Sequence, residues 1–90
     1  MSVKIRIPSQ LRNLTGGEGM VETDAGTVGR IIMELENLHP GIAERLLDGG
    51  EVRRFINIYV DGDDIRFDKG LDTSVADGSE ISIVPAVAGG

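Results

Sequence analysis

The sequence has no cysteine and no tryptophan, and it contains one tyrosine, two phenylalanines and a single histidine, His39. Without cysteine, the chain has no disulfide, no thiolate nucleophile and no cysteine-bound metal. One histidine cannot form a histidine metal pair or a catalytic dyad, and its place before Pro40 favours a role at a helix end. With so few aromatic residues, the hydrophobic core has to be aliphatic.

Long apolar runs are also missing. No stretch approaches the roughly 18 apolar residues that span a membrane, and the opening residues lack the apolar segment of a signal peptide. Acidic residues outnumber basic ones by 15 to 9, which gives a formal net charge of -6. A negative surface repels nucleic-acid phosphates and anionic lipid, so we expect a cytoplasmic chain that binds neither nucleic acid nor membranes.

Ninety residues suffice for one domain with one core, and are too few for a large enclosed pocket. Three patterns that could carry chemistry fall short. Asp61, Asp63 and Asp64 lack the spacing and the glycine of an EF-hand calcium loop, and residues 16–19 lack the Lys-Ser/Thr of a phosphate loop. The serines have no base partner by sequence. We therefore predict no catalytic residue and no metal site.

Hydrophobic periodicity predicts strands at the start of the chain and helices after them. Residues 3–7 alternate apolar and basic side chains, as a half-buried strand does, and residues 20–23 return as its hairpin partner after a glycine-rich turn. From Thr27, whose hydroxyl suits a helix N-cap, the apolar positions shift to helical spacing. The residues expected on the inner face of this helix are Val28, Ile31, Ile32, Leu35 and Leu38.

The His39-Pro40 step should end this helix, because a residue before proline avoids helical geometry. A short second helix is expected to start at Pro40 and to be closed by Gly49-Gly50. Its inward residues are expected to be Ile42, Leu46 and Leu47.

Short strands make up the last part of the chain. We predict strands at 55–60, 65–67 and 80–84, turns at Asp61-Gly62 and Asp77-Gly78, and a strand end at Pro85. This order predicts an α+β fold in which the main helix lies across a mixed sheet, with the first and last strands as neighbours. That is the β-grasp, or ubiquitin-like, arrangement. The predicted domain covers residues 1–85, and residues 86–90 form a flexible C-terminal tail ending in Gly-Gly.

Three features together resemble the ubiquitin-like sulfur carriers of the MoaD/ThiS family. They are the β-grasp element order, the segments 60–62 (Val-Asp-Gly) and 76–81 (Ala-Asp-Gly-Ser-Glu-Ile), and the end at Gly89-Gly90. Within that family, the segments 54–60, 64–67 and 85–90 look most like the carriers of cysteine biosynthesis. The resemblance covers nearly the whole chain.

The resemblance implies a function for the carboxylate of Gly90. In such carriers, an adenylyltransferase of the ubiquitin-activating type (MoeB/ThiF-like) uses ATP and magnesium to adenylate this carboxylate, and a sulfur donor converts it to a thiocarboxylate. In the cysteine branch, a cysteine synthase that depends on pyridoxal phosphate (PLP) accepts the sulfur, and a metallopeptidase releases the cysteine. The carrier is a co-substrate of these enzymes, is itself no enzyme and binds no cofactor.

The residue types of the tail suit this chemistry. Glycine has no side chain, so Gly89 and Gly90 can enter a narrow cleft. The six residues from Pro85 onward reach at most about 20 Å when extended, so Val87 and Ala88 can bridge a docked body and a buried site.

A docking surface is expected on the solvent face of the sheet. If residues 56, 58 and 60 point inward, Phe55 and Tyr59 point outward beside Val84. Exposed aromatics with an aliphatic neighbour suit an interface. The alternative is that these side chains cover the edge of the core, and the strand register decides, because a one-residue slip reverses the assignment.

Other functions stay open on the sequence. The chain could supply sulfur to molybdopterin or thiazole synthesis, act as a non-covalent β-grasp interaction module with an inert tail, or be conjugated to other proteins. Only Lys4 and Lys69 could accept an isopeptide bond, which argues against a modifier that builds chains of itself.

Overall fold

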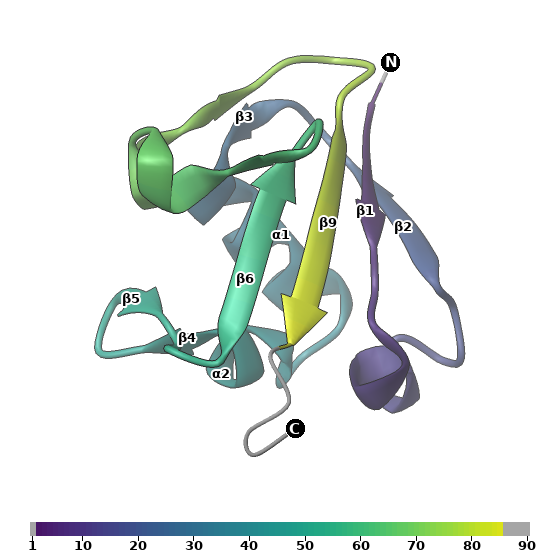
Figure 1. Cartoon of the computed structure of the whole chain (residues 1–90). Helices are drawn as coiled ribbons and strands as arrows, with labels where there is room; N and C mark the ends of the chain where they lie inside the picture. Colours follow the sequence, from purple (N-terminus) through teal and green to yellow (C-terminus); the bar gives the residue numbers. More distant parts are fainter. Residues whose placement is uncertain (1, 86–90) are drawn as a thin grey trace.

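The sheet forms one layer of the molecule and the helices form the other (Figure 1). The computed structural model describes residues 2–85, and within this range the main sheet has five strands in the order β2-β1-β9-β6-β7. Their bounds are β1 Val3–Arg6, β2 Met20–Thr23, β6 Ile56–Val60, β7 Asp63–Asp64 and β9 Glu80–Pro85. Because β9 runs parallel to β1 and antiparallel to β6, the sheet is mixed, as predicted.

The first and last strands lie side by side at the centre of the sheet, with Ile5 opposite Ile81. Successive side chains of a strand point to opposite faces, so the buried isoleucines of β1 and β9 share the inner face. This confirms the predicted neighbours. β2 returns beside β1 as the predicted hairpin partner, and the connection between them contains a 3-10 helix, η1 (Ser9–Leu14), that the alternating pattern does not reveal.

The main helix, α1 (Val28–Leu38), lies across the inner face of the sheet (Figure 1). Thr27 caps it as predicted, because the backbone N–H of Arg30 donates to Thr27 Oγ1 at 3.3 Å. The helix ends at Leu38 as predicted, because the backbone of the next residue, His39, leaves helical geometry before Pro40. No helix within residues 2–85 has the length and apolar character needed to cross a membrane.

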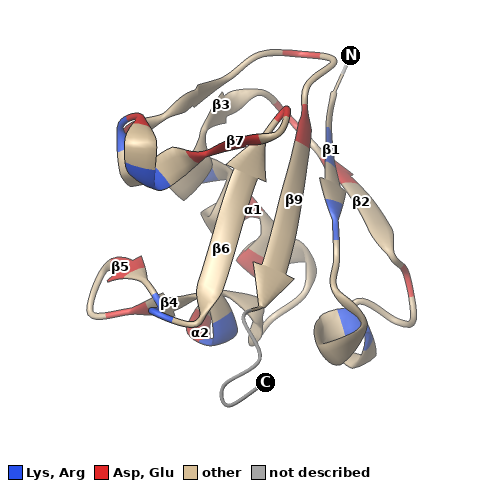
Figure 2. Cartoon of the chain, in the orientation of Figure 1, with Lys and Arg blue, Asp and Glu red and all other residues tan. Residues whose placement is uncertain are grey.

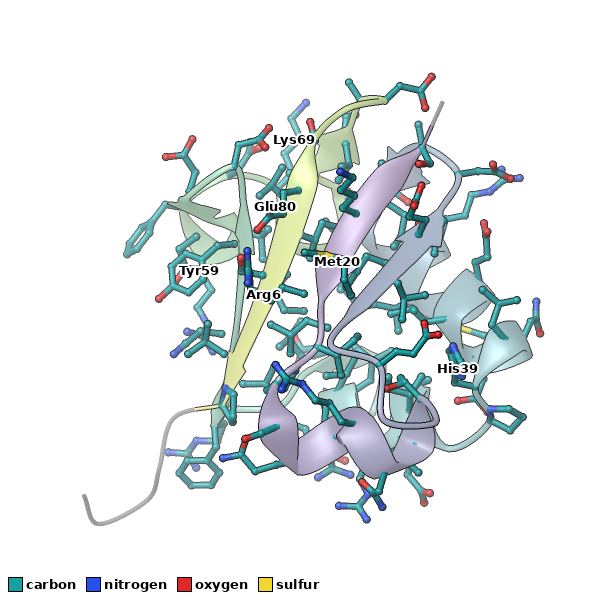
Figure 3. All side chains as sticks on the ribbon, turned by 90° about the vertical axis from the view of Figure 1, so that its right-hand side faces the viewer. Arg6, Met20, His39, Tyr59, Lys69 and Glu80 are labelled. Carbon is teal, nitrogen blue, oxygen red and sulfur yellow. The ribbon has the colours of Figure 1, made fainter. Side chains whose placement is uncertain are left out.

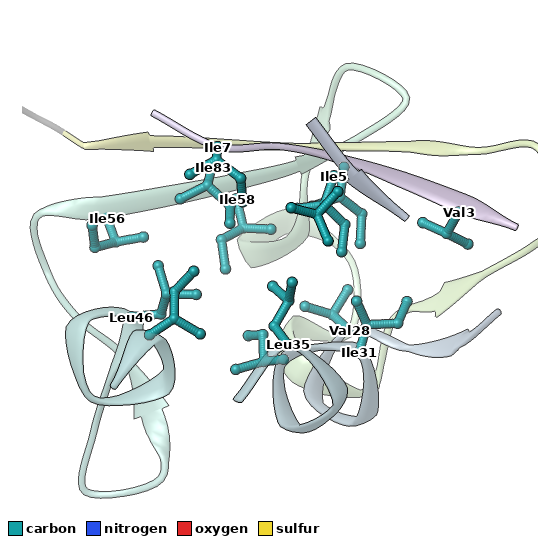
Figure 4. Close-up of a cluster of buried hydrophobic side chains, with 14 of the residues drawn as sticks. Val3, Ile5, Ile7, Val28, Ile31, Leu35, Leu46, Ile56, Ile58 and Ile83 are labelled. Atoms are coloured by element: carbon teal, nitrogen blue, oxygen red, sulfur yellow. The ribbon is translucent and has the colours of Figure 1, made fainter. Parts of the chain in front are cut away.

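Figure 4 shows side chains of α1, among them Val28, Ile31 and Leu35, meeting the isoleucines of the sheet. The core is aliphatic, as the composition requires. Its buried members are Val3, Ile5, Ile7, Leu11, Val21, Val28, Ile31, Ile32, Leu35, Ile42, Leu46, Ile56, Ile58, Ile65, Val75, Ile81 and Ile83.

The inward prediction for Leu38 is wrong, because this side chain is 52% exposed. With 3.6 residues per turn, Leu38 lies at the margin of the apolar stripe, roughly 70° from its centre. The other four predicted positions of α1 are buried.

The second helix, α2 (Ile42–Leu46), begins two residues later than predicted, because Pro40 and Gly41 form the turn between the helices. Gly41 has a φ of 102°, a conformation that favours glycine. The Glu36 carboxylate replaces a cap from the turn itself: it accepts the N–H of Gly41 at 3.0 Å and that of Ala43 at 2.9 Å. Ile42 is buried as predicted.

Two small antiparallel pairs flank the main sheet: β3 (Gly26–Thr27) with β8 (Ser74–Val75), and β4 (Leu47–Asp48) with β5 (Glu51–Val52). The prediction that Gly49-Gly50 closes α2 is wrong. The two glycines form the turn between β4 and β5, with φ of 62° and 86°. Leu47 is half-buried and begins β4 rather than facing inward from the helix.

The strand predicted at residues 65–67 is instead a 3-10 helix, η2 (Ile65–Phe67). The Asp64 carboxylate accepts the N–H of Arg66 at 2.8 Å, a side-chain cap that competes with strand pairing. Ile65 is buried, whereas Phe67 is 91% exposed. A further 3-10 helix, η3 (Gly70–Asp72), leads to β8.

The burial of α1 predicts a sharp contrast between two of its leucines. Leu35→Ala removes a buried side chain and should lower the free energy of unfolding by about 2–5 kcal/mol. Leu38→Ala changes an exposed side chain and should stay within about 0.5 kcal/mol of the wild type. Urea denaturation followed by circular dichroism measures both, and equal losses would contradict the helix orientation.

Glu36 predicts a pH-dependent stability. The backbone N–H of Gly41, and then that of Ala43, lower the pKa of Glu36 below its ordinary value of 4.5. A carboxyl group whose pKa is lower in the folded chain adds stability above its unfolded pKa, and this is lost as pH falls through the folded pKa. Glu36→Gln should therefore lower the melting temperature at pH 7, with the deficit shrinking under acid. The exposed Glu18→Gln is the control, and a deficit independent of pH would contradict the prediction.

Candidate functional site

The end of β9 fixes where the remaining chain begins. Val84 pairs with Asn57 and Pro85 with Ile56, so the strand includes Pro85, one residue more than predicted. Proline lacks an N–H and suits the last position of a ladder. The predicted tail residues Val87, Ala88, Gly89 and Gly90 lie outside the described residues.

The predicted docking residues lie on the outer face of the sheet or at the end of that face where β9 stops. Ile56 and Ile58 are buried, so the expected register of β6 is correct. Tyr59 pairs with Ser82 and is half-buried, while Val84 is 43% exposed and Phe55, just before β6, is 59% exposed. These side chains are accessible to a partner, and their role in docking stays a prediction.

An ion pair that the sequence reasoning missed crosses the same face. Arg6 Nη2 lies 3.1 Å from Glu80 Oε2, and Arg6 Nε donates to the same oxygen at 3.2 Å. Figure 3 shows Tyr59, Arg6, Glu80 and Met20 spread over β6, β9, β1 and β2. The alternating pattern of β1 predicts that Arg6 points outward. It does not predict Glu80 as the partner, because the two residues meet only through the parallel pairing of β1 with β9. An exposed pair of this kind contributes little stability.

The acidic turn after β6 is structural. Asp61 and Gly62 have φ of 49° and 90°, as expected for a tight hairpin turn. Asp61 donates its N–H to Glu80 O, and its Oδ1 accepts the N–H of Glu80, both at 2.9 Å. The Glu80 N–H, and then the Ser79 hydroxyl, lower the pKa of Asp61. Within residues 2–85, no three acidic or histidine side chains are placed to hold a metal ion.

A groove of about 260 Å³ lies beside the end of β9, and the sequence reasoning missed it. Its walls come from α2, the residues before β6, and Pro85. Its charged side chains are Arg45, Asp48, Arg53 and Arg54. We call it the arginine groove. Figure 2 shows basic residues on α2 and beside β4, at the end of the sheet where β9 stops.

A larger groove, of about 460 Å³, lies between β5, β6 and the 3-10 helices. Its floor contains Ile56, Ile58 and Ile65, and Arg66 and Lys69 lie among its lining residues. Arg66 is held in place by the Ile56 carbonyl at 2.7 Å and by the Asn57 side chain. It is an open depression rather than an enclosed pocket.

A mixed five-stranded sheet with one long helix across its inner face defines a ubiquitin-like, β-grasp protein. The model of the ThiS family matches residues 5–90, and the chain belongs to this family. The predicted fold and the family resemblance are thus both confirmed.

Known relatives cover the whole length of the chain. Sulfur carrier protein CysO of Mycobacterium tuberculosis is 47% identical over 93 residues, covering 100% of both chains. In the crystal structure of the Amycolatopsis orientalis BexX/CysO complex, one chain superposes with a TM-score of 0.94 at 48% identity, covering 98% of this chain and 99% of that one. Small archaeal modifier protein 3 of Haloferax volcanii is 33% identical over 93 residues, again covering 100% of both chains.

Proposed function

We propose that this chain is a sulfur carrier that bears the sulfur as a thiocarboxylate on Gly90 and delivers it for cysteine biosynthesis. The observation that carries the proposal is the 47% identity to a sulfur carrier protein CysO along the full length of both chains. The family match also extends to residue 90, so it includes the Gly-Gly pair.

The proposed chemistry has two steps. A carboxylate oxygen of Gly90 attacks the α-phosphorus of ATP, pyrophosphate leaves, and an acyl-adenylate forms. The sulfur of a sulfide-equivalent donor then attacks the acyl carbon, and the carbon–oxygen bond to AMP breaks. Activation has to come first because a free carboxylate is a poor electrophile, whereas a sulfur anion is a good nucleophile at neutral pH.

In this proposal the carrier supplies position and its partners supply catalysis. The ATP and magnesium belong to an adenylyltransferase of the ubiquitin-activating type, and the PLP belongs to a cysteine synthase. A metallopeptidase releases the product. The carrier's own contribution is a fixed body and a chain of five residues after Pro85, which spans at most about 17 Å.

The arrangement of β9 supports this division. The strand is paired on both sides, by β1 and β6, so the position of Pro85 relative to the body is fixed. When a partner binds the outer face, the position of Pro85 relative to that partner is fixed. Gly90 then lies within the length of five residues from a known point. The relative in the BexX/CysO complex is a chain of the same fold bound to another protein.

A mass measurement tests the proposed function. After incubation with the cognate adenylyltransferase, ATP and sulfide, the intact mass should rise by about 16 Da as sulfur replaces a carboxylate oxygen. A chain lacking Gly89 and Gly90 is the control and should not gain the mass. If the full chain stays unchanged with an enzyme that is active on a second carrier, the chain is a non-covalent module.

The two phenylalanines test the proposed docking face. Phe55 lies beside the end of β9, whereas Phe67 lies on η2, and they are 59% and 91% exposed. Phe55→Ala should raise the KM for the carrier in adenylation about 10-fold, since aromatic anchors dominate interfaces. Phe67→Ala should leave it unchanged, and both variants should melt near the wild type. Equal effects would place the interface elsewhere.

Protein conjugation is a second candidate, favoured by the 33% identity to a small archaeal modifier protein. It requires the same adenylate but ends in an isopeptide bond to a lysine of another protein. Cell extract from the native host separates the two: conjugation gives a ladder of heavier species that carry the chain.

Transfer to a molybdopterin or thiazole synthase instead of a cysteine synthase would redirect the sulfur while leaving the carrier chemistry intact.

A further inference from the structure

The arginine groove brings basic side chains from two separate segments to the base of the tail. Arg45 lies in the last turn of α2, and Arg53 and Arg54 lie just before β6. Two contacts hold the second segment against α2: Arg53 Nε donates to Glu44 O, and the Arg53 N–H donates to Leu46 O, both at 2.9 Å. The groove is therefore a fixed feature of the fold.

Its charge is opposite to that of the whole chain. Three of the nine basic residues line this groove, together with one carboxylate, Asp48, while the chain carries a net charge of -6. Within the described range 2–85, the ion pairs are Arg6 with Glu80 and Arg66 with Asp64, so Arg45, Arg53 and Arg54 have no carboxylate partner there. Arg45 and Arg54 are also exposed and make no side-chain hydrogen bond within that range.

The guanidinium groups of Arg45 and Arg54, which make no side-chain hydrogen bond within residues 2–85, suit carboxylates of another molecule, which arginine binds with two parallel hydrogen bonds. Phe55, which also lines the groove, adds an aromatic surface of the kind enriched in protein interfaces. The chain as a whole carries a net negative charge and repels an acidic partner, so a basic groove favours the orientation in which the groove faces that partner.

We propose that the arginine groove docks onto a carboxylate-bearing surface of the activating adenylyltransferase and so orients the carrier with its tail toward that enzyme. This inference rests on the proposed function. Pro85 forms part of the groove wall, so a partner bound there contacts the carrier where residues 86–90 begin. The alternative ligand of the groove is a phosphate of ATP. The ATP has to lie at the carboxylate of Gly90, however, and this carboxylate can lie up to about 17 Å from Pro85 and so from the groove.

The test compares two double charge reversals in the full chain. Arg45→Glu with Arg54→Glu changes the groove. Arg30→Glu with Lys69→Glu changes the net charge by the same amount at exposed positions on α1 and beside η3, away from the groove. Pyrophosphate release by the cognate adenylyltransferase is measured against carrier concentration and against ATP, at low and high salt, and melting curves check folding.

We expect the groove variant to lose about 10-fold or more in kcat/KM for the carrier at low salt, mostly through KM, and less at high salt because salt screens charges. The control pair should change less than about twofold, and the KM for ATP should be unchanged in both. The neutral pair Arg45→Gln with Arg54→Gln should lose an intermediate amount, which keeps the test valid if the reversal impairs folding.

Equal behaviour of the groove and control variants would overturn the inference, as would an altered KM for ATP, which would assign the groove to phosphate. Failure of the proposed function looks different. In that case the wild-type chain itself releases no pyrophosphate and gains no sulfur.

Discussion

The pairing of β9 on both sides is the constraint on which the rest of the structure depends. β1 holds this strand in parallel and β6 holds it antiparallel, while its inner side chains, Ile81 and Ile83, are buried in the core shared with α1. Asp61 binds the backbone of Glu80 and so fixes the strand at its first residue. A slip by one residue would turn both isoleucines to solvent, so the register is strongly specified. The place where the chain passes Pro85 is therefore fixed relative to the body.

That constraint separates the molecule into a body that presents surfaces and a short segment that is proposed to carry chemistry. The outer face of the sheet and the arginine groove adjoin at the end of β9, since Ile56 pairs with Pro85 and both line the groove. An enzyme that recognises either surface is thereby positioned near residue 86. The acidic remainder of the chain opposes other orientations of an acidic partner. The body can then provide the specific recognition, so the Gly-Gly end does not need side chains that a partner recognises.

Burial on one face explains which elements could be predicted from the sequence. Alternation at residues 3–7 and helical spacing after Thr27 predict β1 and α1, because a half-buried strand and a half-buried helix impose these periods. The prediction for residues 65–67 fails because the side chain of Asp64, not the apolar pattern, decides the conformation there. The Arg6–Glu80 pair and the arginine groove arise from contacts between distant segments, which no local pattern encodes. The prediction for Gly90 depends on the family resemblance, since residues 2–85 do not contain it.

In the proposed function, the body stays unchanged while the carbonyl carbon of Gly90 changes its chemistry. Nuclear magnetic resonance of a sample labelled with carbon-13 at the glycine carbonyls, before and after activation with ATP and sulfide, measures this most directly. The carbonyl resonance of Gly90 should move to a thiocarboxylate position, while the resonances of glycines 16–78 stay in place. A Gly90 signal that does not move in a sample that has consumed ATP and sulfide, or shifts spread through the body instead, would contradict the proposed function.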